Sequence, residues 1–245
     1  AEVVRVDRAK GQGFLRGDGS PFDFLGRNRR SIAVDLKHPR GVETVLRLVD
    51  DADGLIEGFR PGVAERLGIG PDVCRARNPK LVYGRMTGWG QQGPWARAVG
   101  HDINYIAITG ALHAIGPAGG PPVAPLNLVG DFGGGGLWLA YGMLAAFVER
   151  ASSGEGQVVD AAMVDGATTL MASILGAAQT GFWSDERGTN MLDGGSHFYN
   201  TYATRDGKWM SIGSIEPQFY AELLRCLGLE GEDLPAQMDQ SQWPA

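Results

Sequence analysis

The sequence has few of the residues that build disulfide-rich or metal-binding proteins. Its 245 residues include two cysteines, Cys74 and Cys226, too few for a disulfide framework or a paired-cysteine metal site. It also has no His-Glu-x-x-His motif, so we expect no metal. Two cysteines without a framework are typical of a reducing compartment, and we expect a cytoplasmic protein.

Segments for secretion or for crossing a membrane are also missing. The chain opens on Ala1-Glu2-Val3-Val4-Arg5-Val6-Asp7-Arg8, which alternates like a strand and does not read as a signal peptide. The longest uncharged stretches, 103–130 and 166–184, are interrupted by Pro, Gly, Thr or Gln, so neither predicts a membrane span. The net charge of −6 provides no general attraction for nucleic acid, and an anionic ligand needs a local positive cluster.

Several catalytic signatures are absent. Gly133–Gly136 has no following Lys-Ser/Thr, which excludes a nucleotide P-loop. Asp131-Phe132-Gly133 matches one kinase tripeptide, but the other kinase motifs are missing. No Gly-x-Ser-x-Gly elbow is present, which excludes that class of serine hydrolase.

The first third of the chain alternates between strand and helix patterns. We expect strands at 31–36, 54–59 and 81–86, with an amphipathic helix at 39–51. Further helices should start at Pro61 and after Pro71. This rhythm predicts an α/β protein with an open, Rossmann-like parallel sheet that binds ligands at the carboxyl ends of its strands.

The composition changes after this region. Residues 103–148 contain one formally charged side chain, Asp131, so we expect the segment to be buried. The pattern then predicts a helix over 135–150, a strand over 157–160 and a helix over 164–176. Residues 197–212 predict a β-hairpin around Arg205-Asp206-Gly207. We therefore expect a large α/β domain over 1–190 and the beginning of a smaller α+β domain over 191–245.

Asp131 is the strongest single candidate for chemistry. A carboxylate inside an apolar segment is costly to desolvate unless it is paired or hydrogen-bonded. It precedes Phe132 and the glycines 133–136, where we expect a loop to become a helix. The alternative is an aspartate that only caps that helix.

His101 is the second candidate. It lies at the edge of the charge-free segment beside Asp102, and histidine is the commonest general base because it titrates near neutrality. The alternative is a hydrogen-bonding residue at a helix N-terminus. The other histidines, His38, His113 and His197, have no comparable glycine-flanked context.

Two charged clusters lie at predicted strand ends. Arg27-Asn28-Arg29-Arg30, with Arg8 and Lys10 upstream, is the densest positive patch and suits phosphate recognition; a solvated surface loop is the alternative. Glu57-Gly58-Phe59-Arg60-Pro61-Gly62 follows an apolar strand, where open α/β sheets bind ligands, although ordinary capping also explains it.

Taken together, these stretches resemble the family III CoA-transferases (CaiB/BaiF-like proteins), and within them the racemase branch that acts on α-methylacyl-CoA. The segments that carry the resemblance run through almost the whole chain: Val3-Val4-Arg5-Val6-Asp7-Arg8, Asn28-Arg29-Arg30-Ser31, Val34-Asp35-Leu36-Lys37, Glu57-Gly58-Phe59-Arg60-Pro61-Gly62-Val63, Met86-Thr87-Gly88-Trp89-Gly90-Gln91, Gly100-His101-Asp102-Ile103-Asn104-Tyr105, Val129-Gly130-Asp131-Phe132-Gly133-Gly134-Gly135, Gly156-Gln157-Val158-Val159-Asp160-Ala161-Ala162 and Ile215-Glu216-Pro217-Gln218-Phe219-Tyr220. The histidine in the Gly100–Tyr105 stretch favours the racemase branch.

The resemblance implies inversion of the α-carbon of 2-methylacyl-CoA thioesters in fatty-acid metabolism, by proton transfer through an enolate. His101 and Asp131 match the two proton-transfer residues, and Glu216 matches the acidic residue that orients the histidine. The residues that match CoA-ester contacts are Arg8, Val34, Asp35, Leu36, Lys37, Gly100, Asp102, Ile103, Asn104 and Tyr105, with Arg60 and Arg85 as weaker candidates.

The resemblance also implies an interlocked homodimer. It implies no separate cofactor, because coenzyme A is part of the substrate. By comparison with the family, we expect the chain to be truncated, lacking a first strand before Ala1 and the C-terminal segment that returns to the large domain after Ala245.

Two alternatives have a different chemistry. In a CoA-transferase, Asp131 would attack the thioester to form a mixed anhydride and pass CoA to another acid; His101 argues against that route, which needs no imidazole. A non-catalytic CoA-binding module is the other alternative. Exchange of the α-proton with solvent indicates a racemase, transfer to an added acid indicates a transferase, and neither indicates a module.

Overall fold

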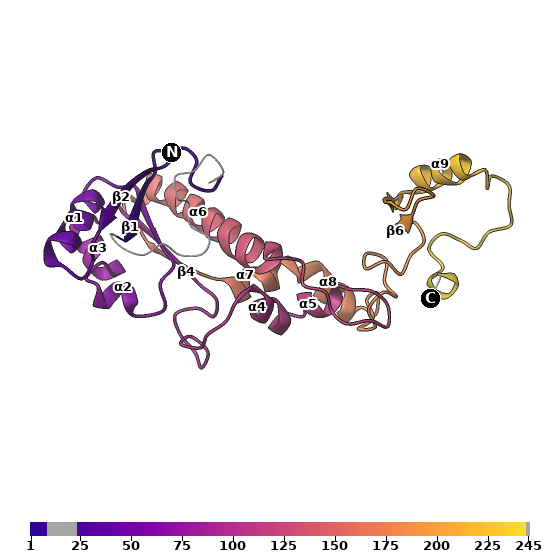
Figure 1. The fold of residues 1–245 in the computed structure, drawn as a ribbon, viewed down its shortest axis with the longest axis horizontal. Coiled ribbons are helices and arrows are strands. Elements are labelled where there is room, and N and C mark those ends of the chain that lie inside the picture. Colours follow the sequence, from indigo (N-terminus) through magenta and orange to yellow (C-terminus); the bar gives the residue numbers. More distant parts are fainter. Residues whose placement is uncertain (9–23, 244–245) are drawn as a thin grey trace. The chain divides into compact units, whose positions relative to one another are not determined.

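The computed structural model describes residues 1–8 and 24–243, so Lys10 lies outside the described residues. Its contacts divide the chain into two compact units, each built from two segments (Figure 1). The first unit comprises Ala1–Ala98 and Leu137–Ala162, and the second comprises Val99–Gly136 and Met163–Ala245. This division does not coincide with the expected boundary between residues 190 and 191, which stays a prediction.

The first unit contains two parallel sheets. Strands β1 (Val4–Arg8) and β2 (Arg30–Val34) pair in parallel, with Val4 opposite Arg30 and Arg8 opposite Val34. Strands β3 (Gly54–Glu57), β4 (Val82–Thr87) and β5 (Val158–Ala162) form a parallel sheet in the order β3-β4-β5. The α/β class with parallel sheets, predicted from the alternation of strand and helix patterns, is confirmed.

Helices connect these strands close to where the sequence predicts them. They are α1 (Pro39–Val49), α2 (Val63–Arg66), α3 (Pro71–Arg77) and α6 (Trp138–Ser153). Proline occupies the first turn of α1 and α3, where its missing N–H costs no hydrogen bond. The glycine at the end of α6, Gly154, adopts a left-handed φ of 79°, which glycine tolerates and which ends the helix.

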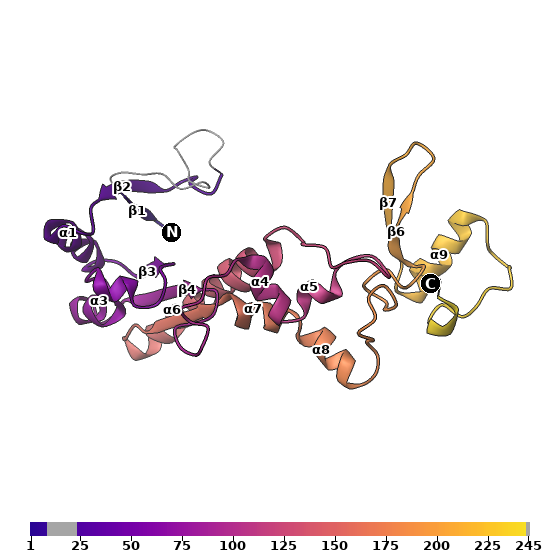
Figure 2. The ribbon, with the colours of Figure 1, turned by 60° about the horizontal axis from the view of Figure 1, so that its bottom comes forward.

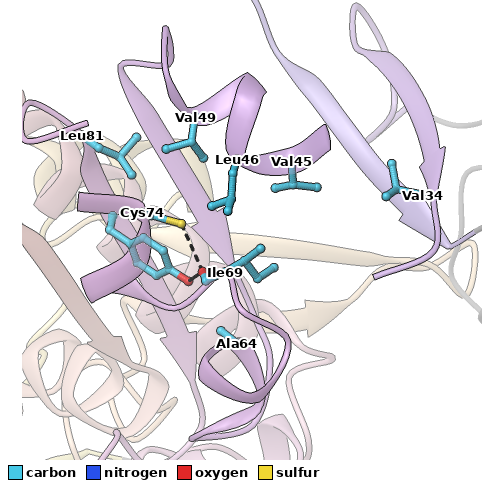
Figure 3. Packing of buried hydrophobic residues seen from close by; sticks show 9 residues of the cluster. Val34, Val45, Leu46, Val49, Ala64, Ile69, Cys74 and Leu81 are labelled. Carbon is cyan, nitrogen blue, oxygen red and sulfur yellow. Dashed lines mark hydrogen bonds between the residues drawn. The ribbon is translucent and has the colours of Figure 1, made fainter. Parts of the chain in front are cut away.

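The main core of this unit lies under α1. The buried residues Val45, Leu46 and Val49 of α1 belong to one cluster with Leu81 and Ile69 (Figure 3). Two buried polar groups meet on a single acceptor there: the Cys74 thiol and the Tyr83 hydroxyl both donate to the carbonyl of Ile69, at 3.3 and 2.8 Å. Burial raises the pKa of Cys74 to about 11, so this thiol is a packing group and not a nucleophile.

The second unit begins with short helices and ends with a small α+β segment. The helices are α4 (Asp102–Ile108), α5 (Ala111–Ala114), α7 (Met163–Leu170), α8 (Ala172–Gln179) and α9 (Pro217–Leu227), followed by the 3₁₀ turn η2 (Gln240–Gln242). Strands β6 (Tyr199–Ala203) and β7 (Trp209–Gly213) pair in antiparallel fashion (Figure 2). The predicted hairpin is confirmed.

A π-helix, η1 (Leu128–Leu137), precedes α6. The sequence pattern predicts a loop followed by a helix at about residue 135, because an α-helical period does not describe this glycine-rich stretch. Short π-helical turns occur frequently at functional sites. Asp131, the strongest single candidate from the sequence, lies inside this helix.

Burial of the charge-free segment 103–148 is a wrong prediction for this chain. Its exposed large apolar residues are Ile103, Ile108, Val123, Leu126, Leu128, Phe132, Leu137, Tyr141, Leu144 and Val148. A segment without charge is expected to be covered, but the covering surface can belong either to the same chain or to a partner. In the described residues no helix is both long and apolar enough to cross a membrane.

The glycines of η1 and α7 let two helices touch. A Cβ on Gly166 would lie 1.9 Å from the carbonyl oxygen of Gly134, and a Cβ on Gly134 would lie 2.5 Å from the amide nitrogen of Ala167. Both distances are far below van der Waals contact, and the obstacle is backbone on each side. Gly134 and Gly166 are therefore required by close packing and not by a flexible loop.

We predict that Gly166→Ala lowers the free energy of unfolding by about 1–3 kcal/mol, because overpacking pushes η1 away from α7. The matched control is Gly176→Ala in α8, where nothing lies within 4 Å of an added Cβ and alanine favours the helix by up to about 1 kcal/mol. Urea unfolding of both variants measures the difference. Equal midpoints for the two variants would contradict this close packing.

Candidate active site

His101 lies immediately before α4 and acts as its N-cap. Its backbone is extended, with φ −134°, and its N–H donates to the side-chain oxygen of Asn104 at 3.0 Å. His101 is an exposed residue. The helix N-terminus therefore fixes the backbone of His101 while the residue stays accessible.

The next residue, Asp102, is the buried carboxylate of this region, with 5% of its surface exposed. One oxygen, Oδ2, accepts hydrogen bonds from the N–H groups of Gly130 and Asp131 at 2.8 and 2.7 Å. Hydrogen bonds from N–H groups to an ionised acceptor are stronger than neutral ones. The sequence predicts Asp102 only as a contact to a CoA ester, although its position between a histidine and the charge-free stretch is a signal for a role of this kind.

Asp131 lies in the first half of η1 and is half-buried. Its Oδ2 accepts a hydrogen bond from the Asn127 side-chain amide at 3.2 Å. Asp131 is inside the helix, so the alternative of a residue that only caps it is wrong. The expectation that Asp131 is the desolvated carboxylate of the segment is corrected as well, because Asp102 is the deeper of the two.

Asp102 therefore brings the two strongest candidates together. It is bonded through its own backbone to His101 and through Oδ2 to the N–H of Asp131. The backbones of His101 and Asp131 are thus connected through Asp102, on one side by a peptide bond and on the other by a hydrogen bond of 2.7 Å. Of the two residues, His101 is exposed and Asp131 is half-buried.

Glu216 caps α9 with its backbone, and its side chain makes no capping hydrogen bond. The residue is exposed. Among the hydrogen bonds of the described part of the second unit, none joins Glu216 to His101. The expected contact between them stays a prediction.

Several residues expected to contact a CoA ester meet at one edge of the first unit. Arg8 is the last residue of β1 and lies opposite Val34, the last residue of β2. Asp35, Leu36 and Lys37 follow directly, and the Lys37 N–H donates to the Asp35 side chain at 3.0 Å. Because the strands are parallel, both chain ends leave the sheet at its carboxyl edge, where open α/β sheets bind ligands.

The arginine cluster 27–30 lies at the other end of β2. Arg30 is the first residue of the strand and forms an ion pair with Glu2 on the surface. Five residues of strand place Arg30 and Val34 roughly 13 Å apart. Strand register thus separates Arg8, at the carboxyl edge, from Arg30, at the amino edge.

Glu57, the last residue of β3, forms a buried ion pair with Arg85, which lies opposite it in β4. Arg85 Nε lies 2.9 Å from Glu57 Oε1, and its Nη1 lies 2.8 Å from Glu65 Oε1. Burial disfavours the charged guanidinium, but the hydrogen bonds that it donates to Glu65 and Glu57 outweigh this effect and raise the pKa of Arg85. Arg60, the other weaker candidate, is exposed.

The remaining histidines have structural partners. His38 caps α1, where its Nδ1 accepts from the Arg40 N–H at 3.1 Å. His197 lies 2.9 Å from the Tyr220 hydroxyl, and burial lowers its pKa. In the described residues no group of three or more His, Cys, Asp or Glu side chains could hold a metal ion.

Comparison with known proteins decides the family. Residues 1–243 match the sequence profile of CoA-transferase family III. The chain belongs to CoA-transferase family III. The family also includes proteins named CoA-transferases, such as the succinyl-CoA--L-malate CoA-transferase beta subunit of Chloroflexus aurantiacus.

Within family III, the chain is similar to α-methylacyl-CoA racemases. It is 48% identical to the mouse protein over 244 residues and 47% identical to the human protein over 246 residues. Each match covers 100% of this chain and 62% of the relative. The chain thus spans less than two thirds of the length of these relatives.

The fold is also that of solved family III structures. The crystal structure of Rv3272 from M. tuberculosis superposes with a TM-score of 0.75 at 31% identity, over 98% of this chain and 65% of that one. The likeness confirms the expected fold class, and the assignment of individual site residues rests on the geometry above.

Proposed function

We propose that the whole protein inverts the α-carbon of 2-methylacyl-CoA thioesters by transferring a proton between two bases. The observation that carries this proposal is the contact of Asp102, the residue next to His101, with the backbone N–H of Asp131. Likeness to mouse and human α-methylacyl-CoA racemase supports it. A transferase needs the carboxylate but has no use for the histidine.

The reaction proceeds in two proton transfers. One base removes the α-proton, and the electron pair of the broken C–H bond moves into the thioester to form an enolate. The second group, in its protonated form, then donates its proton to the opposite face of the carbon, which forms a new C–H bond. Inversion requires one group on each side of the carbon, each able to accept the proton from one enantiomer and to donate a proton to the other.

The other residues hold the reacting groups in place. In the proposed mechanism Glu216 orients the imidazole of His101 through a hydrogen bond of the whole protein, since none joins the two among the described residues. The thioester itself acidifies the α-proton, so the proposal includes no metal and no redox cofactor. The two cysteines, both unpaired, agree with a cytoplasmic location.

The CoA portion binds at the carboxyl edge of β1 and β2. An acidic protein with net charge −6 needs local positive charge to hold a polyanion. Arg8 supplies it beside the Val34–Lys37 backbone, whereas Arg29 and Arg30 are placed at the far end of the strand.

A second copy of the chain covers the exposed face of α6. Leu137, Tyr141, Leu144 and Val148 are 71%, 68%, 63% and 74% exposed. Their spacing puts them on one helical face. Such a stripe on a soluble helix indicates an interface, and the interlocked homodimer implied by the family supplies the partner.

We predict that substitution of either base stops inversion but leaves a half-reaction. In the whole protein, His101→Ala and Asp131→Asn should each lower racemisation about 10²–10⁴-fold in both directions. Each variant should still exchange the α-proton of the enantiomer that faces the surviving base, with His101 on the S side. Deuterium incorporation from each separate enantiomer in D₂O measures this.

The assignment is wrong if His101→Ala inverts at the parent rate. It is also wrong if both folded variants lose exchange from both enantiomers. The control is Cys226→Ser, at an exposed position, which should invert and exchange like the parent. Asn104→Ala is not a suitable control, because it changes the N-cap at His101.

Arg8→Ala should weaken CoA binding by about 10- to 100-fold, the loss of one charge-assisted hydrogen bond of about 1.5–3 kcal/mol. The matched control is Arg29→Ala, which removes the same charge near the other end of β2 and should leave the Kd close to the parent value. Calorimetric titration with CoA at low and high salt measures both, and the Arg8 effect should shrink with salt. Equal losses for the two variants would show that only net charge matters.

Charges placed on the α6 stripe should separate the dimer. Tyr141→Lys combined with Leu144→Glu should convert the whole protein to a monomer in sedimentation velocity, because burying two charges in an apolar interface is costly. Val73→Lys, on an exposed apolar position of α3, is the control and should stay dimeric. A stripe variant that remains a dimer would contradict the interface.

A further inference from the structure

We propose that Asp102 is a positioning residue that sets the spacing between His101 and Asp131, an inference that rests on the proposed racemase function. The two candidates come from different segments: His101 is the N-cap of α4, and Asp131 lies in η1, with α5 between the two helices. The Asp102 side chain connects α4 to η1 through hydrogen bonds from the N–H groups of Gly130 and Asp131.

The contact is specific in its geometry. A single oxygen, Oδ2, accepts from two consecutive N–H groups, those of Gly130 and Asp131. The other oxygen, Oδ1, is buried and has no hydrogen-bond partner among the described residues. A buried carboxylate with one unpartnered oxygen is a net cost to folding, so its presence is better explained by what Oδ2 holds than by stability.

Gly130 shows how closely the two helices must meet. A Cβ at this position would lie 2.6 Å from Asp102 Oδ2 and 2.8 Å from its Cγ. Any side chain there would force the carboxylate and the η1 backbone apart. The glycine and the aspartate are therefore two halves of one contact.

Packing of the same helices does not depend on this contact. Ile106 of α4, Ala111 of α5 and Ala167 of α7 form a buried cluster, with Val129 of η1 packed against it. Apolar packing is non-directional, so it keeps the helices associated but does not fix their register. The hydrogen bonds to Asp102 are directional and fix the position of η1 relative to α4. Loss of the Asp102 side chain should therefore shift Asp131 while the apolar cluster stays packed.

A shift of this kind has a distinctive kinetic effect. Inversion needs both groups at the correct distance from one carbon, whereas α-proton exchange needs only one group. A misplacement of about 1 Å can cost about 10²-fold. Inversion should therefore fall much more than exchange.

The experiment changes the contact from both sides. Gly130→Ala and Asp102→Ala in the whole protein should each lower inversion about 10²-fold, while exchange of each enantiomer's α-proton in D₂O falls less than tenfold. Asp102→Asn keeps an acceptor oxygen in the same place and should recover most of the lost inversion. Gly136→Ala is the control, because its Cβ would make only an ordinary contact of 3.6 Å with the Asp131 carbonyl.

The outcomes are distinguishable. If inversion and exchange fall by the same factor in folded variants, or if neither falls, Asp102 has no positioning role. Should Asp102→Ala fail to fold, Gly130→Ala and Asp102→Asn decide the matter by the same ratio. A parent protein that neither exchanges nor inverts would instead overturn the proposed function, and this inference with it.

Discussion

The contact of one buried carboxylate oxygen with two backbone N–H groups organises the candidate active site. Asp102 belongs to α4, and the N–H groups of Gly130 and Asp131 belong to η1. Because His101 is the neighbour of Asp102, this contact connects the backbones of the two residues proposed to transfer the proton. The contact requires glycine at position 130, since an added side chain there would collide with the Asp102 carboxylate.

Several glycines of the second unit are required by the same kind of close contact. The sequence has 38 glycines, and in the second unit several of them mark places where backbones approach each other. Gly134 and Gly166 allow η1 to touch α7, as Gly130 allows it to touch Asp102. The η1 helix is thus held from two sides by contacts that tolerate no Cβ, which gives Asp131 a fixed backbone without a large apolar core around it.

Local pattern was enough to predict the order of elements but not their environment. The β-α-β alternation, the proline at the start of α3 and the hairpin of β6 and β7 depend on neighbours in sequence, and they are confirmed. The roles of Asp102 and Arg85 depend on partners 28 or 29 positions away, so composition could not reveal them. His101 and Asp131 stood out because each is chemically unusual in its surroundings, whereas burial of 103–148 failed because charge pattern does not identify the covering partner.

The most direct test of this account uses a single enantiomer of a 2-methylacyl-CoA ester in D₂O with an added carboxylic acid. The two-base mechanism predicts that the whole protein forms the opposite enantiomer carrying deuterium at the α-carbon, with no CoA passed to the acid. CoA transfer to the acid with the original α-proton and configuration retained would contradict it, and would assign Asp131 to a transferase reaction.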